Sequence, residues 1–192
     1  MILRATGFGQ TGPYRDRAGF ARLFEAMGGL TYITGEPEGA PMHTGYPMGD
    51  AIGGLFGTIG VLAALCRRVM EPDAPGEEID LSMTEAVLRL LDFLPIEHDQ
   101  LGEVRERSGN ANQYSAPSAV YSSRDGRYVS LSGSTNAIFV ANARSIGRPD
   151  LPEDPRFMTN SLRMGYSAEL NEVFSRWMGE HTLDEILEAI ER

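Results

Sequence analysis

The sequence contains no lysine, since all seventeen basic residues are arginine. Schiff-base formation, a phosphate-binding P-loop and a pyridoxal phosphate site each require a lysine amine. The residues of this chain therefore cannot supply any of these chemistries. Cysteine occurs once, at Cys66, which excludes an internal disulfide scaffold. Because no signal peptide or transmembrane segment is recognisable, this cysteine usage predicts a protein of the reducing cytoplasm.

The chain also lacks net positive charge, with a formal net charge of -10 at pH 7. So acidic a chain is electrostatically unsuited to nucleic acid or an anionic membrane, and neither is expected as a partner. No metal site is expected either, because His98 has no second histidine or cysteine at ligand spacing. The 192 residues are 42% hydrophobic, which suits one globular domain or parts of two.

The carboxylate of Asp50 ends a turn rich in glycine and proline, residues 44–50 (TGYPMGD). The next sixteen residues, 51–66, carry no charge, which places Asp50 in the first turn of a buried helix. The free N–H groups and positive dipole end of a helix N-terminus favour an ionised carboxylate. Two interpretations are open: Asp50 is a nucleophile, or it is a cap whose side chain bonds the backbone of Ile52 or Gly53.

Small residues recur along this helix at helical spacing, at Gly53, Gly57, Gly60 and Ala64. Each glycine costs roughly 1 kcal/mol of helix propensity relative to alanine, so a close packing partner is expected on this face. A membrane span is the rival interpretation, but the uncharged run is shorter than the eighteen or more residues that a span requires. We therefore expect a buried core helix that touches another backbone or a ligand.

Strands and helices alternate in the first half of the chain, which is typical of an α/β fold. Besides the helix after Asp50, strands are predicted at residues 1–5, 30–34 and 77–81, and helices at residues 20–27 and 82–94. A capping box, residues 82–85 (SMTE), opens the last of these helices, and Pro95 is expected to end it. The charged segment 97–107 is predicted to be a linker between domains.

The second half predicts a small α+β domain. Two strands, residues 119–122 and 128–132, flank an Asp-Gly turn and form a predicted hairpin. Helices are expected at residues 136–146, behind a Ser-Thr cap, and at residues 168–178. The capping box at residues 182–185 (TLDE) opens a last helix.

Several motifs together resemble the family III CoA-transferases (CaiB/BaiF family), the group of formyl-CoA transferase and the carnitine CoA-transferases. The motifs are residues 7–14 (GFGQTGPY), 17–20 (RAGF), 34–37 (TGEP), 45–50 (GYPMGD), 76–82 (GEEIDLS) and 107–110 (RSGN). The resemblance covers essentially the whole chain, yet family members are longer, so it implies a fragment. It implies that residues 1–96 belong to a Rossmann-like large α/β domain, 97–117 to a linker and active-site loop, and 118–192 to a truncated small α+β domain.

The resemblance implies that Asp50 is the nucleophile of CoA transfer between an acyl-CoA and a small carboxylic acid. The intermediates would be an aspartyl anhydride and an aspartyl-CoA thioester. Coenzyme A would be a substrate, with no permanently bound cofactor, and the protein an interlocked homodimer. Arg17, Ala18 and Phe20 would contact CoA.

The resemblance also assigns residues to a loop that covers the catalytic aspartate. These are Asn110, Asn112 and Gln113. Where relatives have successive glycines, this chain has residues 112–115 (NQYS), so glycine-type loop mobility is not expected from it.

Two other functions remain open. An α-methylacyl-CoA racemase uses an aspartate and a histidine as a proton-transfer pair. In those racemases the histidine stands where this chain has Phe20, which favours transfer. The second alternative is a non-catalytic fragment or assembly module in which Asp50 is only a helix cap.

Overall fold

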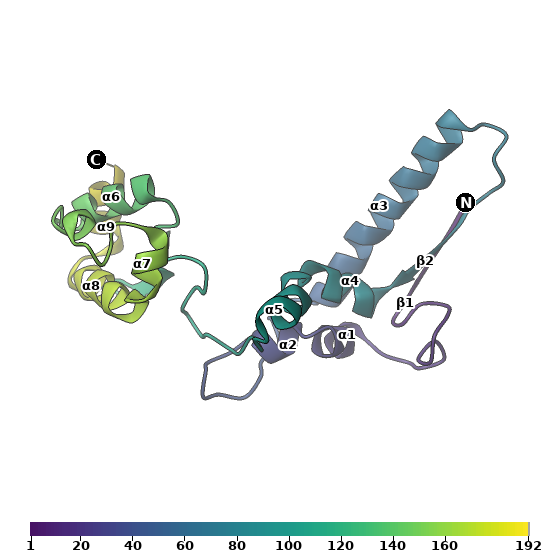
Figure 1. Cartoon of the computed structure of the whole chain (residues 1–192), viewed down its shortest axis with the longest axis horizontal. Coiled ribbons are helices and arrows are strands. Elements are labelled where there is room, and N and C mark those ends of the chain that lie inside the picture. Colours follow the sequence, from purple (N-terminus) through teal and green to yellow (C-terminus); the bar gives the residue numbers. More distant parts are fainter. Residues whose placement is uncertain (192) are drawn as a thin grey trace. The chain divides into compact units, whose positions relative to one another are not determined.

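The computed structural model describes residues 1–191. They divide into two compact units, Met1–Gly109 and Asn110–Arg192, which we call unit 1 and unit 2 (Figure 1). The division falls within residues 97–117, for which a linker and an active-site loop are predicted. Both units contain helices and short strands, so the mixed α/β class is confirmed.

Unit 1 is built around a long helix that lies along a pair of parallel strands (Figure 1). Its elements in chain order are β1 (Ile2–Thr6), α1 (Ala21–Met27), α2 (Leu30–Ile33), α3 (Met48–Met70), β2 (Glu78–Ser82), α4 (Met83–Leu90) and α5 (Phe93–Leu101). The pairing of β1 with β2 runs from Ile2 opposite Glu78 to Thr6 opposite Ser82. Parallel neighbours require a long crossover, and α3 is its main element.

The glycine face of α3 packs closely, as predicted, but against side chains of the sheet and of α4. A β-carbon added at Gly57 would lie 3.1 Å from Leu3 Cδ2, and one at Gly60 would lie 3.0 Å from Ile79 Cγ2. One at Gly53 would lie 3.1 Å from Met83 Cγ. The glycines therefore let a helix approach the sheet more closely than larger residues would allow.

The opposite face of α3 is exposed, so the prediction of a buried helix is wrong for that face. Large apolar side chains are exposed there, at Leu55, Ile59, Leu62, Leu65 and Val69. The argument from length also fails, because the helix has 23 residues and is long and apolar enough to cross a membrane. Length and composition are a weak criterion, however, since core helices of soluble proteins meet them too.

Other local predictions for unit 1 are wrong. Residues 30–33 form helix α2 instead of a strand, and Gly29 before it has a left-handed φ of 95°. Pro95 lies in the first turn of α5, where its missing N–H costs no hydrogen bond. The chain therefore leaves α4 at Leu90 and turns into α5, which occupies the first five residues of the predicted linker.

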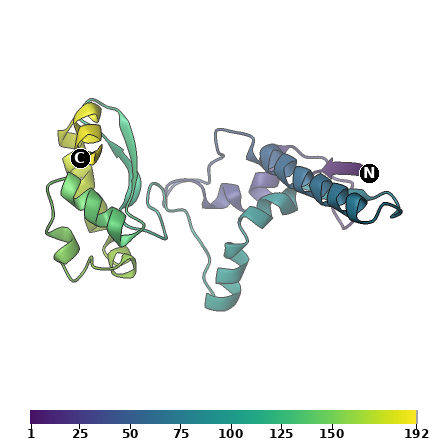
Figure 2. The ribbon, with the colours of Figure 1, turned by 90° about the horizontal axis from the view of Figure 1, so that it is seen from above.

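Unit 2 consists of a hairpin lying along one side of a set of helices (Figure 2). Its elements are β3 (Ser118–Ser122), β4 (Tyr128–Ser132), α6 (Asn136–Ser145), the 3-10 turn Leu151–Glu153, α7 (Asn160–Met164), α8 (Ser167–Glu180) and α9 (Leu183–Glu191). The antiparallel pairing of β3 with β4 confirms the predicted hairpin, and Gly126 in its turn has a φ of 73°. Helix α7 was not predicted.

The hydrophobic core of unit 2 is larger than that of unit 1. Its buried residues include Phe139, Phe157, Leu170, Phe174 and Met178. Arg163 is buried among them with 0% exposure, and its guanidinium donates to the carbonyls of Ala116, Gly133 and Phe157. These bonds let a charge lie in the core without an acidic partner.

Both helix caps predicted for unit 2 are confirmed. Thr135 Oγ1 accepts from Ile138 N at 3.2 Å. At the start of α9, Glu185 N donates to Thr182 Oγ1 while Thr182 N donates to a Glu185 carboxylate oxygen, which is the complete capping box.

Candidate active site

Asp50 is the third residue of α3 and is exposed at the first turn of the helix. The turn before it is held by Thr44, whose hydroxyl donates to the Tyr46 carbonyl at 2.8 Å, and by Met48 N, which donates to the same carbonyl. The dipole of α3 creates a positive potential here. The chain therefore presents a carboxylate at the positive end of a 23-residue helix.

The cap interpretation of Asp50 is wrong. The N-cap position of α3 is Pro47, and no side chain caps the helix from that position. Among the hydrogen bonds and ion pairs found in residues 1–191, none uses the Asp50 carboxylate. Its oxygens are thus not engaged in holding the helix and remain available to a ligand.

A different acid, Glu25, binds the start of α3. Its Oε1 accepts the Gly49 N–H at 3.1 Å, although Glu25 belongs to α1 and is only 1% exposed. Sequence reasoning missed this residue. The available signal was its spacing of four residues from the inward-facing Ala21, which places an acid on the apolar side of the helix.

Gly49 is also in close contact with the backbone of α1. A β-carbon at Gly49 would lie 2.9 Å from the Ala21 carbonyl oxygen and 3.2 Å from Ala21 Cα. The first turns of α1 and α3 therefore meet backbone to backbone, one residue away from Asp50. Only glycine allows this approach.

The same contact brings together two of the predicted site residues. Phe20 precedes Ala21 and is 86% exposed, and Asp50 follows Gly49. Each stands one residue from the place where α1 and α3 meet. The exposed ring of Phe20 and the unbonded carboxylate of Asp50 thus lie on either side of the contact between α1 and α3.

The other predicted CoA contacts lie in the loop before α1. Arg17 and Ala18 are exposed, and the Arg17 guanidinium lies 4.2 Å above the ring of Tyr14. Stacking on an aromatic face leaves the outer edge of a guanidinium free to donate to phosphate.

The three predicted loop residues belong to unit 2, whereas Asp50 belongs to unit 1. The Asn110 side chain exchanges two hydrogen bonds with the Val120 backbone, at 2.7 and 2.8 Å. Asn112 Oδ1 accepts from the backbone N–H groups of Tyr114 and Ser115, and Gln113 is half-buried. Side-chain hydrogen bonds thus order this loop within unit 2.

A sequence profile described as CoA-transferase family III matches residues 1–192. The chain belongs to CoA-transferase family III. Two relatives from Chloroflexus aurantiacus are each 38% identical to it. Succinyl-CoA–D-citramalate CoA-transferase matches 97% of this chain and 46% of its own length. The beta subunit of succinyl-CoA–L-malate CoA-transferase matches 98% of this chain and 46% of its own length.

Solved structures lead to the same family. A CaiB/BaiF family protein from Brucella suis is 30% identical with a TM-score of 0.78, over 100% of this chain and 50% of that chain. The chain therefore spans about half the length of the relatives it matches, which is consistent with a fragment.

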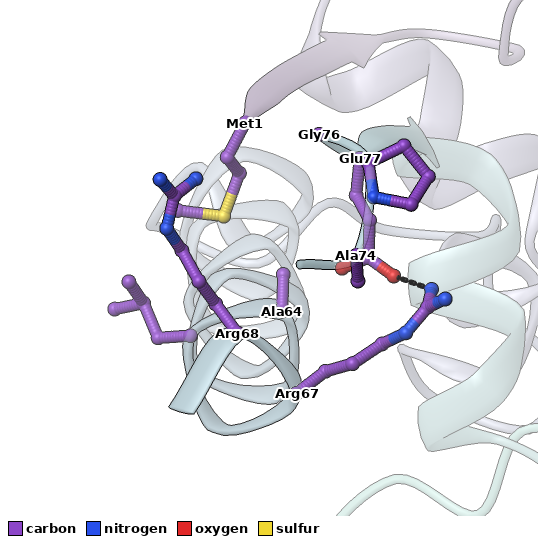
Figure 3. A pocket seen from close by; sticks show the side chains of 9 residues that line it. Met1, Ala64, Arg67, Arg68, Ala74, Gly76 and Glu77 are labelled. Atoms are coloured by element: carbon purple, nitrogen blue, oxygen red, sulfur yellow. Dashed lines mark hydrogen bonds and ion pairs between the residues drawn. The ribbon is translucent and has the colours of Figure 1, made fainter. Parts of the chain in front are cut away.

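A family III CoA-transferase must bind a CoA thioester, and the hollow at the far end of α3 is not suited to it (Figure 3). The hollow has a volume of about 30 Å³ and is lined by Met1, Ala64 and Arg68, among others. A volume of this size holds one water molecule. Arg67, at its rim, donates to Glu77 instead of facing a ligand. Seventeen residues of helix, about 25 Å, separate Arg67 from Asp50.

Within residues 1–191, no group of three or more His, Cys, Asp or Glu side chains is placed to hold a metal ion.

Proposed function

We propose that the protein transfers coenzyme A between an acyl-CoA and a small carboxylic acid, with Asp50 as the nucleophile. The observation that carries the proposal is the free Asp50 carboxylate at the N-terminus of α3. Family membership supports the reaction class.

The reaction proceeds by successive acyl substitutions. An Asp50 oxygen attacks the thioester carbon, the C–S bond breaks, and CoA leaves as a thiolate with a mixed anhydride on Asp50. The thiolate attacks the aspartyl carbonyl, which releases the donor acid and leaves an aspartyl-CoA thioester. The acceptor carboxylate attacks this thioester, the C–S bond breaks, and CoA thiolate is expelled as a second anhydride forms. The thiolate then attacks the acceptor's carbonyl, which gives the new acyl-CoA and free Asp50.

Each attack generates an oxyanion, which nearby hydrogen-bond donors must stabilise. Water must be kept away from the anhydride and thioester intermediates, since hydrolysis would waste the acyl-CoA. We assign this exclusion to the loop of Asn110, Asn112 and Gln113, and CoA contacts to Arg17, Ala18 and Phe20. The two Chloroflexus relatives are named for succinyl-CoA, which makes it the first donor to test.

The assembly and location belong to the same proposal. We expect a homodimer in the cytoplasm, with no resident cofactor and with acyl-CoA and a carboxylic acid as the only small-molecule partners. Light scattering of the complete gene product measures the assembly state.

Racemisation is the second candidate reaction. Phe20 cannot carry a proton, so the histidine of an Asp–His pair would have to come from elsewhere. Within unit 1, the Nδ1 atom of His43 lies 3.9 Å from Glu25 Oε2 and 3.4 Å from Thr31 Oγ1. Its engagement there favours transfer.

The decisive experiment compares wild type with Asp50→Asn and Asp50→Ala in the complete gene product. Label exchange is measured between succinyl-CoA, or a panel of acyl-CoAs, and free carboxylic acids. We expect a loss on the order of 10³-fold or more for both variants, because the nucleophile is removed. Asp73→Asn, an exposed aspartate in another loop, is the matched control and should retain full exchange.

Two further readouts separate the alternatives. Hydroxylamine trapping during turnover, followed by mass spectrometry, should locate the adduct at Asp50. Exchange of the α-proton with deuterated water would support racemisation instead. Full label exchange in both Asp50 variants would eliminate Asp50 as the nucleophile. Absence of exchange in the wild type as well would support the non-catalytic interpretation.

A further inference from the structure

The most unusual side chain in unit 1 is the buried carboxylate of Glu25. Acidic side chains are rarely buried without a specific partner, because losing water is costly. At 1% exposure, Glu25 has its Oε1 bonded to the Gly49 N–H and its Oε2 3.9 Å from His43 Nδ1. Both partners lie in the segment that leads into or begins α3. The proposed reaction does not yet give this acid a role.

We infer that Glu25 is a positioning residue for CoA transfer, which sets the location of the Asp50 carboxylate by holding the first turn of α3. This inference rests on the proposed role of Asp50 as nucleophile. Glu25 acts through Gly49 and touches no substrate.

Two independent contacts fix the peptide before Asp50. The Gly49 N–H is one of the helix N–H groups that have no partner within α3, and Glu25 supplies one from α1. On the other side, the Ala21 carbonyl leaves no space for a β-carbon at Gly49. Hydrogen bond and backbone contact both come from α1, so α1 determines where the first turn of α3 lies.

His43 extends this arrangement to the loop before α3. Its Nδ1 lies 3.9 Å from Glu25 Oε2 and 3.4 Å from Thr31 Oγ1. Glu25 thus contacts α3 directly and the loop of residues 34–47 through His43. The Gly49 bond needs only an acceptor oxygen, which glutamate provides whether or not it is protonated and which glutamine also provides.

A misplacement of about 1 Å at a reacting group can lower a rate by two orders of magnitude. Removing Glu25 should therefore reduce the rate of the chemical step while leaving the binding of acyl-CoA nearly unchanged. A residue needed only for stability would lower the amount of folded protein without changing the kcat of the folded fraction.

The test measures kcat and KM for label exchange between succinyl-CoA and labelled succinate, using the complete gene product. For Glu25→Ala we expect kcat to fall about 10- to 100-fold with KM within about threefold of wild type. Glu25→Gln should recover most of the lost kcat, because its amide oxygen can still accept the Gly49 N–H. Rates are given per folded protein, with the folded fraction determined by circular dichroism.

Ser82→Ala is the control for loss of stability alone, since Ser82 caps α4 in the same unit by accepting from Glu85 N at 3.3 Å. It should lower the melting temperature without lowering kcat. If Glu25→Ala retains wild-type kcat, or if Glu25→Gln is as impaired as Glu25→Ala, the positioning role is wrong. If Asp50→Asn also retains full exchange, the proposed function fails as well, so the two failures are distinguishable.

Discussion

At the scale of single residues, Gly49 shows how a missing side chain places a functional one. Its N–H is bonded by Glu25, and its α-carbon faces the backbone of Ala21. Asp50 follows directly and keeps its carboxylate free of the helix. The position of the candidate nucleophile therefore depends on a neighbour that has no side chain.

Replacing Gly49 by alanine should destabilise unit 1 and lower CoA transfer. The new β-carbon would lie 2.9 Å from the Ala21 carbonyl oxygen, so one of the two helices must move. We expect a loss of about 1–3 kcal/mol, as for other overpacked sites, and at least a tenfold lower kcat. Thermal unfolding and label exchange measure the two effects.

Gly54 offers a matched control on the same helix. No atom lies within 4 Å of a β-carbon added there, and the residue is exposed. Gly54→Ala should stabilise the protein by up to about 1 kcal/mol through helix propensity and leave kcat unchanged. Equal stability of the Gly49→Ala and Gly54→Ala variants would show that the α1–α3 contact does not constrain the helix.

Residue-level prediction from the sequence succeeded where the signal was local. The place of Asp50 in the first turn of α3 followed from a glycine-proline turn before an uncharged run, whereas the sequence left open whether its carboxylate was free or a cap. Glu25 was missed although its spacing from Ala21 places it on the apolar side of α1, because that pattern does not reveal its partner, which is 24 residues away. The glycine face was predicted correctly, but its partners, Leu3, Ile79 and Met83, come from distant segments.

At the scale of elements, the hairpin and the caps of α6 and α9 were predictable because a few adjacent residues determine them. The conformation of residues 30–33 was not predictable, because so short a segment has no clear periodicity. Its contacts with α1 favour a helix. Pro95 was misread because proline is tolerated in a first helical turn. The exposed face of α3 was misread because composition does not reveal which side is covered.

The start of α9 should make the stability of unit 2 depend on pH. The Thr182 backbone N–H, followed by the Thr182 hydroxyl, holds the pKa of the Glu185 carboxyl below its usual range. A carboxyl with a lowered pKa in the folded state contributes stability above its unfolded pKa, near 4.5, and loses it as pH falls through the folded value. The capping box should therefore contribute fully at pH 7 and progressively less as the pH falls below about 4.5.

The Glu185→Gln variant tests whether the capping box of α9 makes the stability of unit 2 depend on pH. Chemical denaturation at pH 7 should show the variant less stable than wild type, and the difference should shrink as the pH is lowered to about 3. Glu172→Gln, an exposed glutamate on α8 paired with Arg176, is the control and should change stability little at either pH. A difference between Glu185→Gln and wild type that does not vary with pH would contradict the assigned cause.

At the scale of the whole molecule, the two units differ in how much apolar surface they bury. The main core cluster of unit 2 has twelve buried residues, whereas that of unit 1 has three, Ile52, Ala86 and Val87. The sheet of unit 1 is a single parallel pair of five-residue strands. Such a pair is marginal without cover on both faces. Unit 1 of this 192-residue chain should therefore open more readily than unit 2.

Hydrogen–deuterium exchange of the 192-residue chain checks this difference. Amides in β4, α6 and α8 should exchange on the order of 100-fold more slowly than amides in β1, β2 and α1, because local opening costs less where fewer apolar contacts are broken. Phe174→Ala, in the core of unit 2, should accelerate exchange in unit 2 and leave unit 1 unchanged, since Phe174 packs within the unit 2 cluster. Protection of β1 and β2 equal to that of β4 would instead mean that the glycine-mediated contact with α3 stabilises unit 1 as strongly as a larger core does.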